Sequence, residues 1–186
     1  NSGGTILQPQ EIRVALSHGP FATLLSALND NHDWRAVYGP KNARLKDIEL
    51  ILRFLSLYFH RASYERPMKA FLNRYMAANR SLQKQPEGVI RPLFEKTVHA
   101  IRTGIGEKAF RPFGGAVNAA VMDALLYGVA SRLASGVLSK PAALKIPHET
   151  LLKNKQFLDA VTKATADVEN VKIRLDAAKQ AFAEAK

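Results

Sequence analysis

The sequence predicts an all-α fold: a compact, orthogonal bundle of about seven to nine helices. Apolar residues recur at spacings of three and four in almost every segment, as they do in amphipathic helices. The alternation of apolar and polar residues that is typical of strands is almost absent. Two segments, 45–61 and 116–133, are apolar on nearly all sides, so we expect two central helices buried in the core.

Three short helices are expected before the first central segment. The first spans 10–17 and ends at the breaker His18-Gly19-Pro20. The second spans 21–29, where Phe21 and three leucines fall on one face. The third is a further turn at 33–37, before Gly39-Pro40.

The central segment 45–61 carries its polar residues on one stripe, because Glu49, Arg53, Ser56 and His60 recur every three or four positions. Glu49 and Arg53 are expected to form an i, i+4 ion pair at the helix edge. Two amphipathic helices follow, one starting near Arg66-Pro67 and one at 89–105, joined by the polar linker 83–88. The inward residues of the first are Met68, Phe71, Leu72, Tyr75 and Met76.

The second half begins with a loop over 104–115 that leads into the central segment 116–133. Small residues in that segment predict a close approach to a neighbouring helix. Asn118 and Asp123 interrupt its apolar surface, and as buried polar groups they need hydrogen-bond partners. After a connector at 139–147, two last helices are expected at 148–164 and 168–183.

Length and composition fit one domain over 1–186, with a linker at 1–8 and two helical halves at 9–110 and 111–186. The chain opens with a glycine turn that runs straight into a helix start at Pro9. We therefore expect a fragment of a longer protein. Cysteine is absent, which excludes disulfides, thiolate zinc sites and a cysteine nucleophile and fits the cytoplasm.

The formal net charge of +11 is the strongest global indication of function. Residues 1–110 hold 16 Lys and Arg against 9 acids, a net of +7, and residues 111–186 hold 11 against 7, a net of +4. Such a field attracts polyanions, of which nucleic acid is the usual one. Solubility alone is the competing explanation. No apolar run is long enough to span a membrane, so no membrane partner is expected.

The stretch from Arg61 to Arg80 is the best candidate nucleic-acid surface, because it interleaves basic residues with an aromatic and an amide. A solvated outer face is the bland alternative. Contacts made by such a surface would be directed at the phosphate backbone. The candidate residues are Arg61, Tyr64, Arg66, Lys69, Asn73, Arg74 and Arg80.

Other sites have weaker support. Arg111, with the backbone at Gly114 and Gly115 before a helix, is a candidate anion site, although we favour a simple flexible loop. No metal site is predicted, because no two of the five histidines stand three or four residues apart. A P-loop is absent.

Several motifs carry a family resemblance. They are Asn1-Ser-Gly-Gly-Thr-x-Leu-x-x-Gln-Glu-Ile-Arg13, Gly19-Pro-Phe21, Lys46-Asp-Ile-Glu-Leu-x-Leu-Arg-Phe54, Met68-Lys-x-Phe-Leu-Asn-x-Tyr-Met76, Phe110-Arg-x-Phe113, Leu151-x-x-Asn-x-x-Phe157 and Val171-x-x-Arg-Leu175. Together they resemble the helical half of GmrSD-type proteins, which are ParB-related proteins of bacterial modification-dependent restriction and phage-defence systems. The resemblance spans essentially the whole chain.

The resemblance implies a module upstream of Asn1. In the family, a ParB/sulfiredoxin-like module with an Asp-Gly-Gln-Gln-Arg motif, associated with nucleotide hydrolysis, precedes the glycine turn, and an HNH-type nuclease segment follows on the same chain or on a partner. The intact protein would then use a nucleoside triphosphate and a divalent metal, with no cofactor bound by this chain. The resemblance assigns Asn1, Gly3 and Gly4 to the border of that module, and Glu11 and Arg13 to bracing the junction.

Three functions therefore stand side by side. The first is a helical region that supports a nucleotide-hydrolysing module and contacts DNA. The second is a non-catalytic scaffold that docks a module or subunit, with the helix at 168–183 as the docking seam. The third, a self-sufficient hydrolase, has the least support, because the sequence offers no nucleophile–base pair.

Overall fold

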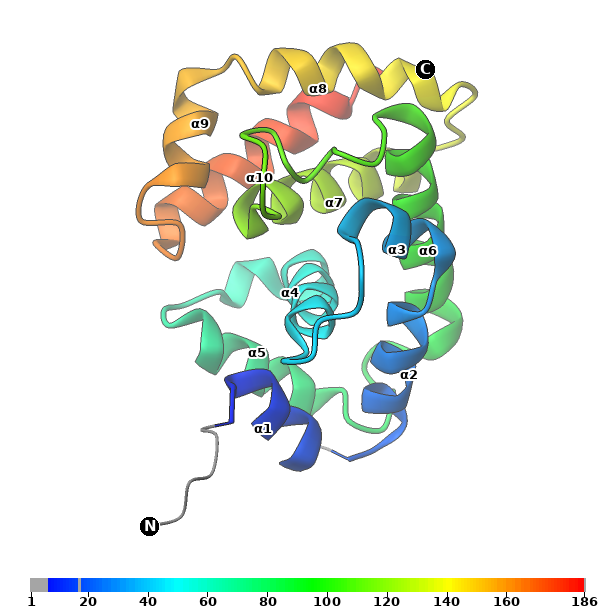
Figure 1. The fold of residues 1–186 in the computed structure, drawn as a ribbon, viewed down its shortest axis with the longest axis vertical. Coiled ribbons are helices and arrows are strands. Elements are labelled where there is room, and N and C mark those ends of the chain that lie inside the picture. Colours follow the sequence, from blue (N-terminus) through cyan, green and yellow to red (C-terminus); the bar gives the residue numbers. More distant parts are fainter. Residues whose placement is uncertain (1–6, 17, 186) are drawn as a thin grey trace.

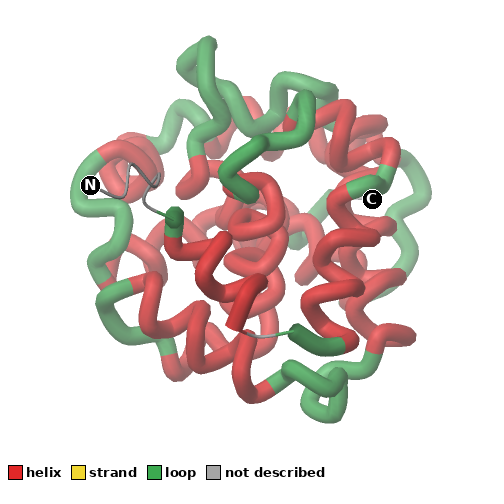
Figure 2. Tube along the Cα trace, turned by 60° about the horizontal axis from the view of Figure 1, so that its bottom comes forward, coloured by secondary structure: helices red, strands yellow, loops and turns green. Residues whose placement is uncertain are grey.

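The computed structural model describes residues 7–16 and 18–185, and within these ranges all regular secondary structure is helical (Figures 1 and 2). The predicted all-α class is confirmed. The α-helices are α1 (Pro9–Leu16), α2 (Pro20–Asn29), α3 (His32–Tyr38), α4 (Lys46–His60), α5 (Met68–Ala78), α6 (Glu87–Gly104), α7 (Ala119–Ala134), α8 (Lys145–Leu151), α9 (Lys155–Thr162) and α10 (Val168–Phe182), with 3-10 turns η1 (Arg61–Ser63) and η2 (Pro141–Leu144).

The helices enclose α4 and cross at steep angles. Figure 1 looks nearly along the axis of α4, whereas α6 runs down the view and α8 runs across it. The helix α7 joins the two halves of the bundle, because it packs against α4 and α6 from the first half of the chain and against α10 from the second. This arrangement is the orthogonal bundle that the sequence predicts.

Asparagine side chains set the starts of three helices. The Oδ1 of Asn118 accepts hydrogen bonds from the backbone N–H groups of Ala120 and Val121, both at 2.9 Å, so α7 starts at residue 119 rather than 116. Asn154 caps α9 through the N–H of Phe157 at 3.0 Å. The prediction of one continuous helix over 148–164 is therefore wrong, because this cap divides the segment into α8 and α9.

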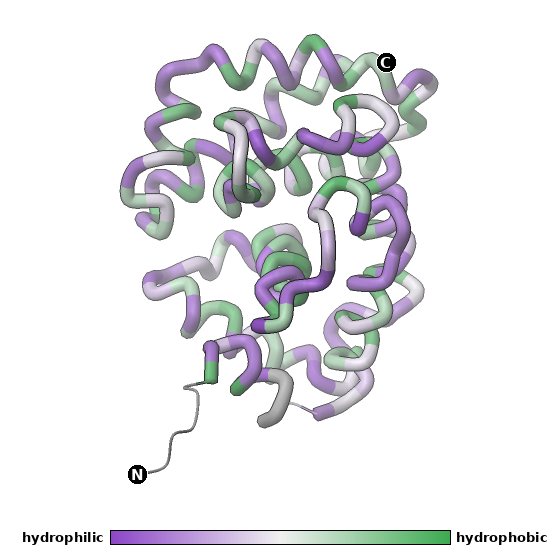
Figure 3. The backbone as a smooth tube through the Cα atoms, in the orientation of Figure 1, coloured by the Kyte–Doolittle hydropathy of each residue, from purple (hydrophilic) through white to green (hydrophobic). Residues whose placement is uncertain are grey.

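The core is centred on the two predicted apolar helices. Ile51, Leu52, Phe54 and Leu55 of α4 are fully buried, and every residue of α7 from Ala120 to Ala130 is buried. Figure 3 shows a run of hydrophobic residues at the centre of the molecule, along α4. One cluster of buried apolar side chains extends from Phe21 to Ala185, so helices from both halves of the sequence share it.

The closest helix approach is between α7 and α10. A Cβ atom on Gly128 would stand 2.8 Å from the backbone carbonyl of Ala178 and 2.9 Å from Phe182 Cδ2, so only glycine fits there. Val171, Leu175, Ala178 and Phe182 of α10 are buried, whereas Val168 at the start of the helix is 47% exposed. Most of the proposed docking seam at 168–183 is therefore part of the core, and Val168 is the large apolar residue of α10 that stays exposed.

Buried ions join the helices across the core. Asp123 of α7 accepts hydrogen bonds from Arg53 of α4 at 2.8 and 2.9 Å and from Arg174 of α10 at 2.7 Å. Burial lowers the pKa of Arg53, but the charge of Asp123 raises it by more, so this guanidinium stays charged. The predicted Glu49–Arg53 pair is wrong, because Arg53 turns inward to Asp123 and Glu49 pairs with Arg13 at 2.7 Å.

A second buried carboxylate, Asp47, fixes the entry to α4. It accepts hydrogen bonds from Asn29 Nδ2 at 2.9 Å, from Arg35 Nη1 at 3.0 Å and from the N–H of Asn42 at 3.1 Å. Burial raises the pKa of Asp47, but these hydrogen bonds together hold it below its usual range. The carboxylate thereby ties α2 and α3 to the start of α4.

Candidate nucleic-acid interface

The helix α5 carries the centre of the predicted basic surface. It buries Phe71, Leu72, Tyr75 and Met76, as predicted, and leaves Lys69, Asn73 and Arg74 exposed. The polar face of α5 therefore points outward over a fixed apolar base. Its basic side chains differ in whether they are free to meet a ligand.

Two of the predicted residues are structural. Arg61 forms an ion pair with Asp176 at 2.7 Å, donates to the hydroxyl of Tyr127 at 3.1 Å, and lies 5.1 Å from the centroid of that ring. Tyr64 is 5% exposed, and its hydroxyl donates to the carbonyl of Ala166 at 2.6 Å. Arg61 holds η1 against α7 and the middle of α10, and Tyr64 holds the residue after η1 against the loop before α10, so we remove both from the candidate interface.

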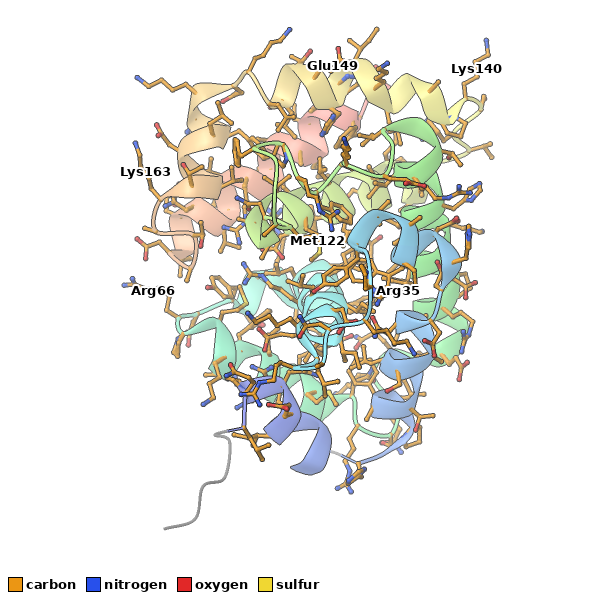
Figure 4. All side chains as sticks on the ribbon, viewed as in Figure 1. Arg35, Arg66, Met122, Lys140, Glu149 and Lys163 are labelled. Atoms are coloured by element: carbon orange, nitrogen blue, oxygen red, sulfur yellow. The ribbon has the colours of Figure 1, made fainter. Side chains whose placement is uncertain are left out.

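Three more of the predicted residues are exposed but already have hydrogen-bond or ion-pair partners within the protein. Arg66 forms an ion pair with Asp167 at 2.5 Å, and Figure 4 shows it projecting from the edge of the molecule. Asn73 Oδ1 accepts from Arg13 Nε at 2.6 Å, and Arg80 Nε donates to the carbonyl of His18 at 2.7 Å. An exposed ion pair contributes little stability, so Arg66 can exchange Asp167 for a phosphate. Asn73 and Arg80 serve the fold first.

Lys69 and Arg74 remain as free cations, since no side-chain hydrogen bond or ion pair joins them to any described residue. Lys84, which the sequence analysis missed, is exposed and equally free among the described residues. The lack of acidic residues around Lys84 could have identified it from the sequence, because residues 66–86 contain five Lys and Arg and not one Asp or Glu. We call Lys69, Arg74 and Lys84, with Arg66 at the margin, the α5 basic face. Lys69 and Arg74 lie about 140° apart around α5, at the two edges of its exposed side, and Lys84 follows in the loop after the helix.

A hollow of about 200 Å³ adjoins Arg74 on this face. Two polar residues, His60 and Ser63, and two aromatic residues, Phe71 and Tyr75, line it together with Arg74. Burial raises the pKa of Tyr75, so its hydroxyl stays protonated, and that hydroxyl has no hydrogen-bond partner among the described residues. A ligand phosphate or sugar at Arg74 would thus lie beside an aromatic wall.

Arginine and lysine divide the positive charge between two uses. Twelve of the thirteen arginines make a side-chain hydrogen bond or ion pair with the protein itself, and Arg74 is the exception in the described part of the chain. Of the thirteen lysines that the structure describes, only Lys41 and Lys163 form an ion pair. The field that a ligand meets is therefore mainly one of lysines.

Two of the five predicted junction residues, Glu11 and Arg13, lie within the described part of the chain. Asn1, Gly3 and Gly4 lie outside the described residues. Glu11 accepts from the N–H of Gln8 at 2.6 Å and lies 3.4 Å from Arg44. Arg13 is 5% exposed and donates to Gln10, Glu49 and Asn73 at 2.6–2.7 Å, which fastens α1 to α4 and α5. Their role at a junction stays a prediction.

The candidate anion site does not assemble. Arg111 Nη1 donates to the carbonyl of Val37 at 2.6 Å, and Nη2 donates to that of Tyr38, so the guanidinium covers the end of α3. Gly114 and Gly115 have φ of +74° and +65° and precede α7 by several residues. The first N–H groups of α7 are already taken by the Asn118 cap.

Within residues 7–16 and 18–185, no group of three or more His, Asp and Glu side chains has the arrangement to hold a metal ion. No helix in the same ranges combines the length and the hydropathy that a bilayer crossing requires. Comparison of the chain with protein-family models, with curated proteins and with solved structures finds no match.

Proposed function

We propose that this chain is the helical region of a GmrSD-like, modification-dependent restriction or phage-defence protein of the bacterial cytoplasm. In this role it supports an upstream nucleotide-hydrolysing module and contacts the DNA backbone through the α5 basic face. The observation that carries the DNA contact is the 21-residue stretch 66–86, which has five cations, no acid, and three side chains free of partners among the described residues. The family resemblance of the motifs supports the rest.

The contact is directed at phosphates rather than at bases. Lys69 and Arg74 stand on a rigid helix, while Lys84 follows in a loop whose backbone N–H groups at Lys84 and Gln85 donate to Asn79 Oδ1. Flexible lysines neutralise phosphate charge without reading sequence. Recognition of a modified base would then belong to another part of the intact protein, together with the nucleoside triphosphate and divalent metal that the resemblance implies.

The test is duplex-DNA binding across a salt series, with a triple variant K69A/R74A/K84A. Each lost phosphate contact lowers the slope of log K against log salt by about 0.9, so three contacts lower it by roughly 2.7. The matched control is K140A/K145A/K153A, which removes the same charge at the opposite end of the molecule, where Figure 4 places Lys140. Equal slopes for the two triple variants would mean that only net charge attracts DNA, and the proposal would fail.

A second function, docking of a neighbouring module, is favoured by two apolar residues. Leu7 and Ile12 are 54% and 37% exposed at α1, which Arg13 holds rigidly against α4 and α5. The variant L7S/I12S should keep the fold of the chain while weakening its association with a ParB/sulfiredoxin-like module supplied as a separate chain, measured by calorimetry. Unchanged association would exclude α1 as the docking surface.

A further inference from the structure

A second site lies where the second half of α6 and the last turn of α7 meet the segment 136–141. It is an open-sided pocket of about 490 Å³. Most of its lining is apolar, and we call this part the apolar floor; it includes Ala100, Leu133, Leu138 and Pro141. The polar side chains of the lining are those of Lys96 and His99. Pockets of this size with an apolar floor and a few convergent polar groups are the usual form of small-molecule sites.

The imidazole of His99 is held in one orientation. Its Nδ1 lies 2.8 Å from Asp33 Oδ2, so Nδ1 donates to that carboxylate and Nε2 is left free to meet a ligand. Asp33 is also ion-paired with Arg102 at 2.5 Å and contacts His32 at 3.4 Å. Burial raises the pKa of Asp33, but its contacts with His99, His32 and Arg102 together lower it, so the carboxylate stays ionised.

The charged side chain that lines the pocket is positive, and no negative side chain among the described lining residues balances it. Lys96 stands one turn before His99 on the same face of α6, and it has no ion-pair partner among the described residues. No Asp or Glu side chain lines the pocket. A ligand that satisfies both polar groups must therefore bring an acidic group, and a ligand that fills the floor must bring apolar surface.

We propose that this pocket binds a small carboxylic acid with an apolar body, whose carboxyl group lies between Lys96 and His99. One proton is shared between the carboxyl group of the ligand and Nε2 of His99. If the acid is protonated it donates to a neutral imidazole, and if the acid is ionised it accepts from an imidazolium, so both cases have the same number of protons and the same hydrogen bond. Asp33 positions the ring for either case. A phosphate would leave the apolar floor unfilled, and an alcohol would leave Lys96 without a counter-charge.

The test is titration of the purified chain with octanoate, octan-1-ol and acetate, followed by amide chemical shifts in two-dimensional NMR. Octanoate should bind with shifts that cluster on α6, the end of α7 and 136–141. Octanol, which has the same body without the charge, should bind about tenfold or more weaker, and acetate, which lacks the body, should bind weakest of all. Equal affinity for octanoate and octanol, or shifts elsewhere in the chain, would overturn the proposal.

Variants make the test specific to the named residues. K96A and H99A should each weaken octanoate binding about tenfold, while K155A, which removes a lysine that does not line the pocket, should leave it unchanged. A134W is the steric variant: Ala134 lines the pocket and is exposed, so a large ring there blocks the ligand without removing a cation. Octanoate binding that survives A134W, or that falls equally in K155A, would refute the assignment.

Discussion

Removing the carboxylate of Asp123 should lower the free energy of unfolding more than removing a charge that is exposed or that has a single partner. Asp123 and Arg174 are both 0% exposed at the side chain, and Arg53 is 15% exposed. The substitution Asp123→Asn leaves two guanidinium groups in the core facing no carboxylate. The amide oxygen of the asparagine can still accept a hydrogen bond, and Arg174 keeps its bond to the carbonyl of Thr165, but neither group balances the two positive charges. An uncompensated buried charge of this kind costs about 3–5 kcal/mol.

The size of the effect can be expressed as a melting temperature. The unfolding entropy of a chain of 186 residues is about 0.4 kcal/mol per kelvin, so the expected loss corresponds to a decrease in Tm of roughly 8–13 °C. Urea titration followed by fluorescence of Trp34, the single tryptophan and fully buried, measures the free energy directly. The control is Asp159→Asn, at an exposed i, i+4 pair with Lys163, whose denaturation midpoint should not move.

A third variant separates charge from packing. Arg174→Met removes one guanidinium but leaves Asp123 paired with Arg53 through Nε and Nη2, so the remaining buried charge is balanced. It should lose less free energy of unfolding than Asp123→Asn, although it removes a larger side chain. A loss below about 1 kcal/mol for Asp123→Asn, or a larger loss for Arg174→Met, would refute the reasoning that charge balance holds this core together.

Three other predictions follow from the fold. The pKa of Asp47 is depressed in the folded state, so the stabilisation by its carboxylate is present above about pH 4 and is lost as the pH falls toward the folded-state pKa. Asp47→Asn should therefore flatten the dependence of the unfolding free energy on pH between about pH 5 and 3. Parallel pH profiles for the variant and the original protein would contradict this prediction. Gly128→Ala should destabilise by about 1–3 kcal/mol, whereas Gly88→Ala, where an added Cβ meets no atom within 4 Å, should be neutral or stabilising by up to about 1 kcal/mol in the same urea titration. Arg61→Ala should lower the free energy of unfolding by about 1 kcal/mol through loss of the Tyr127 and Asp176 contacts while leaving the salt slope of DNA binding unchanged; a lower slope would return Arg61 to the interface.

Periodicity predicted the helices, their buried faces and the two central elements, because a 3.6-residue repeat is a local property of the sequence. It did not predict the ionic partners. Glu49 and Arg53 are four residues apart, yet their partners are Arg13, 36 residues from Glu49, and Asp123, 70 residues from Arg53. A surface i, i+4 pair contributes only a few tenths of a kcal/mol, so a buried pairing elsewhere in the fold overrides it.

The candidate sites were limited by the same locality. Arg61 and Tyr64 read as basic and aromatic surface residues, but their partners at 127, 166 and 176 are supplied by the second half of the chain. The pocket beside Lys96 and His99 depends on Asp33, 66 residues before His99, and on a loop after α7. Only the fold brings these groups together, whereas the absence of acids from 66–86 could have been read directly.

The division of labour between arginine and lysine has a consequence for how this protein can diverge. Most arginine substitutions break hydrogen bonds that join separate segments of the fold, so they are constrained by folding, while the side chains of most described lysines form no ion pair within the protein. Surface charge can therefore drift through neutral substitution with the architecture intact. A homologue with the same helical fold need not keep the same electrostatic potential, and affinity for a polyanion can be gained or lost in evolution without refolding the chain.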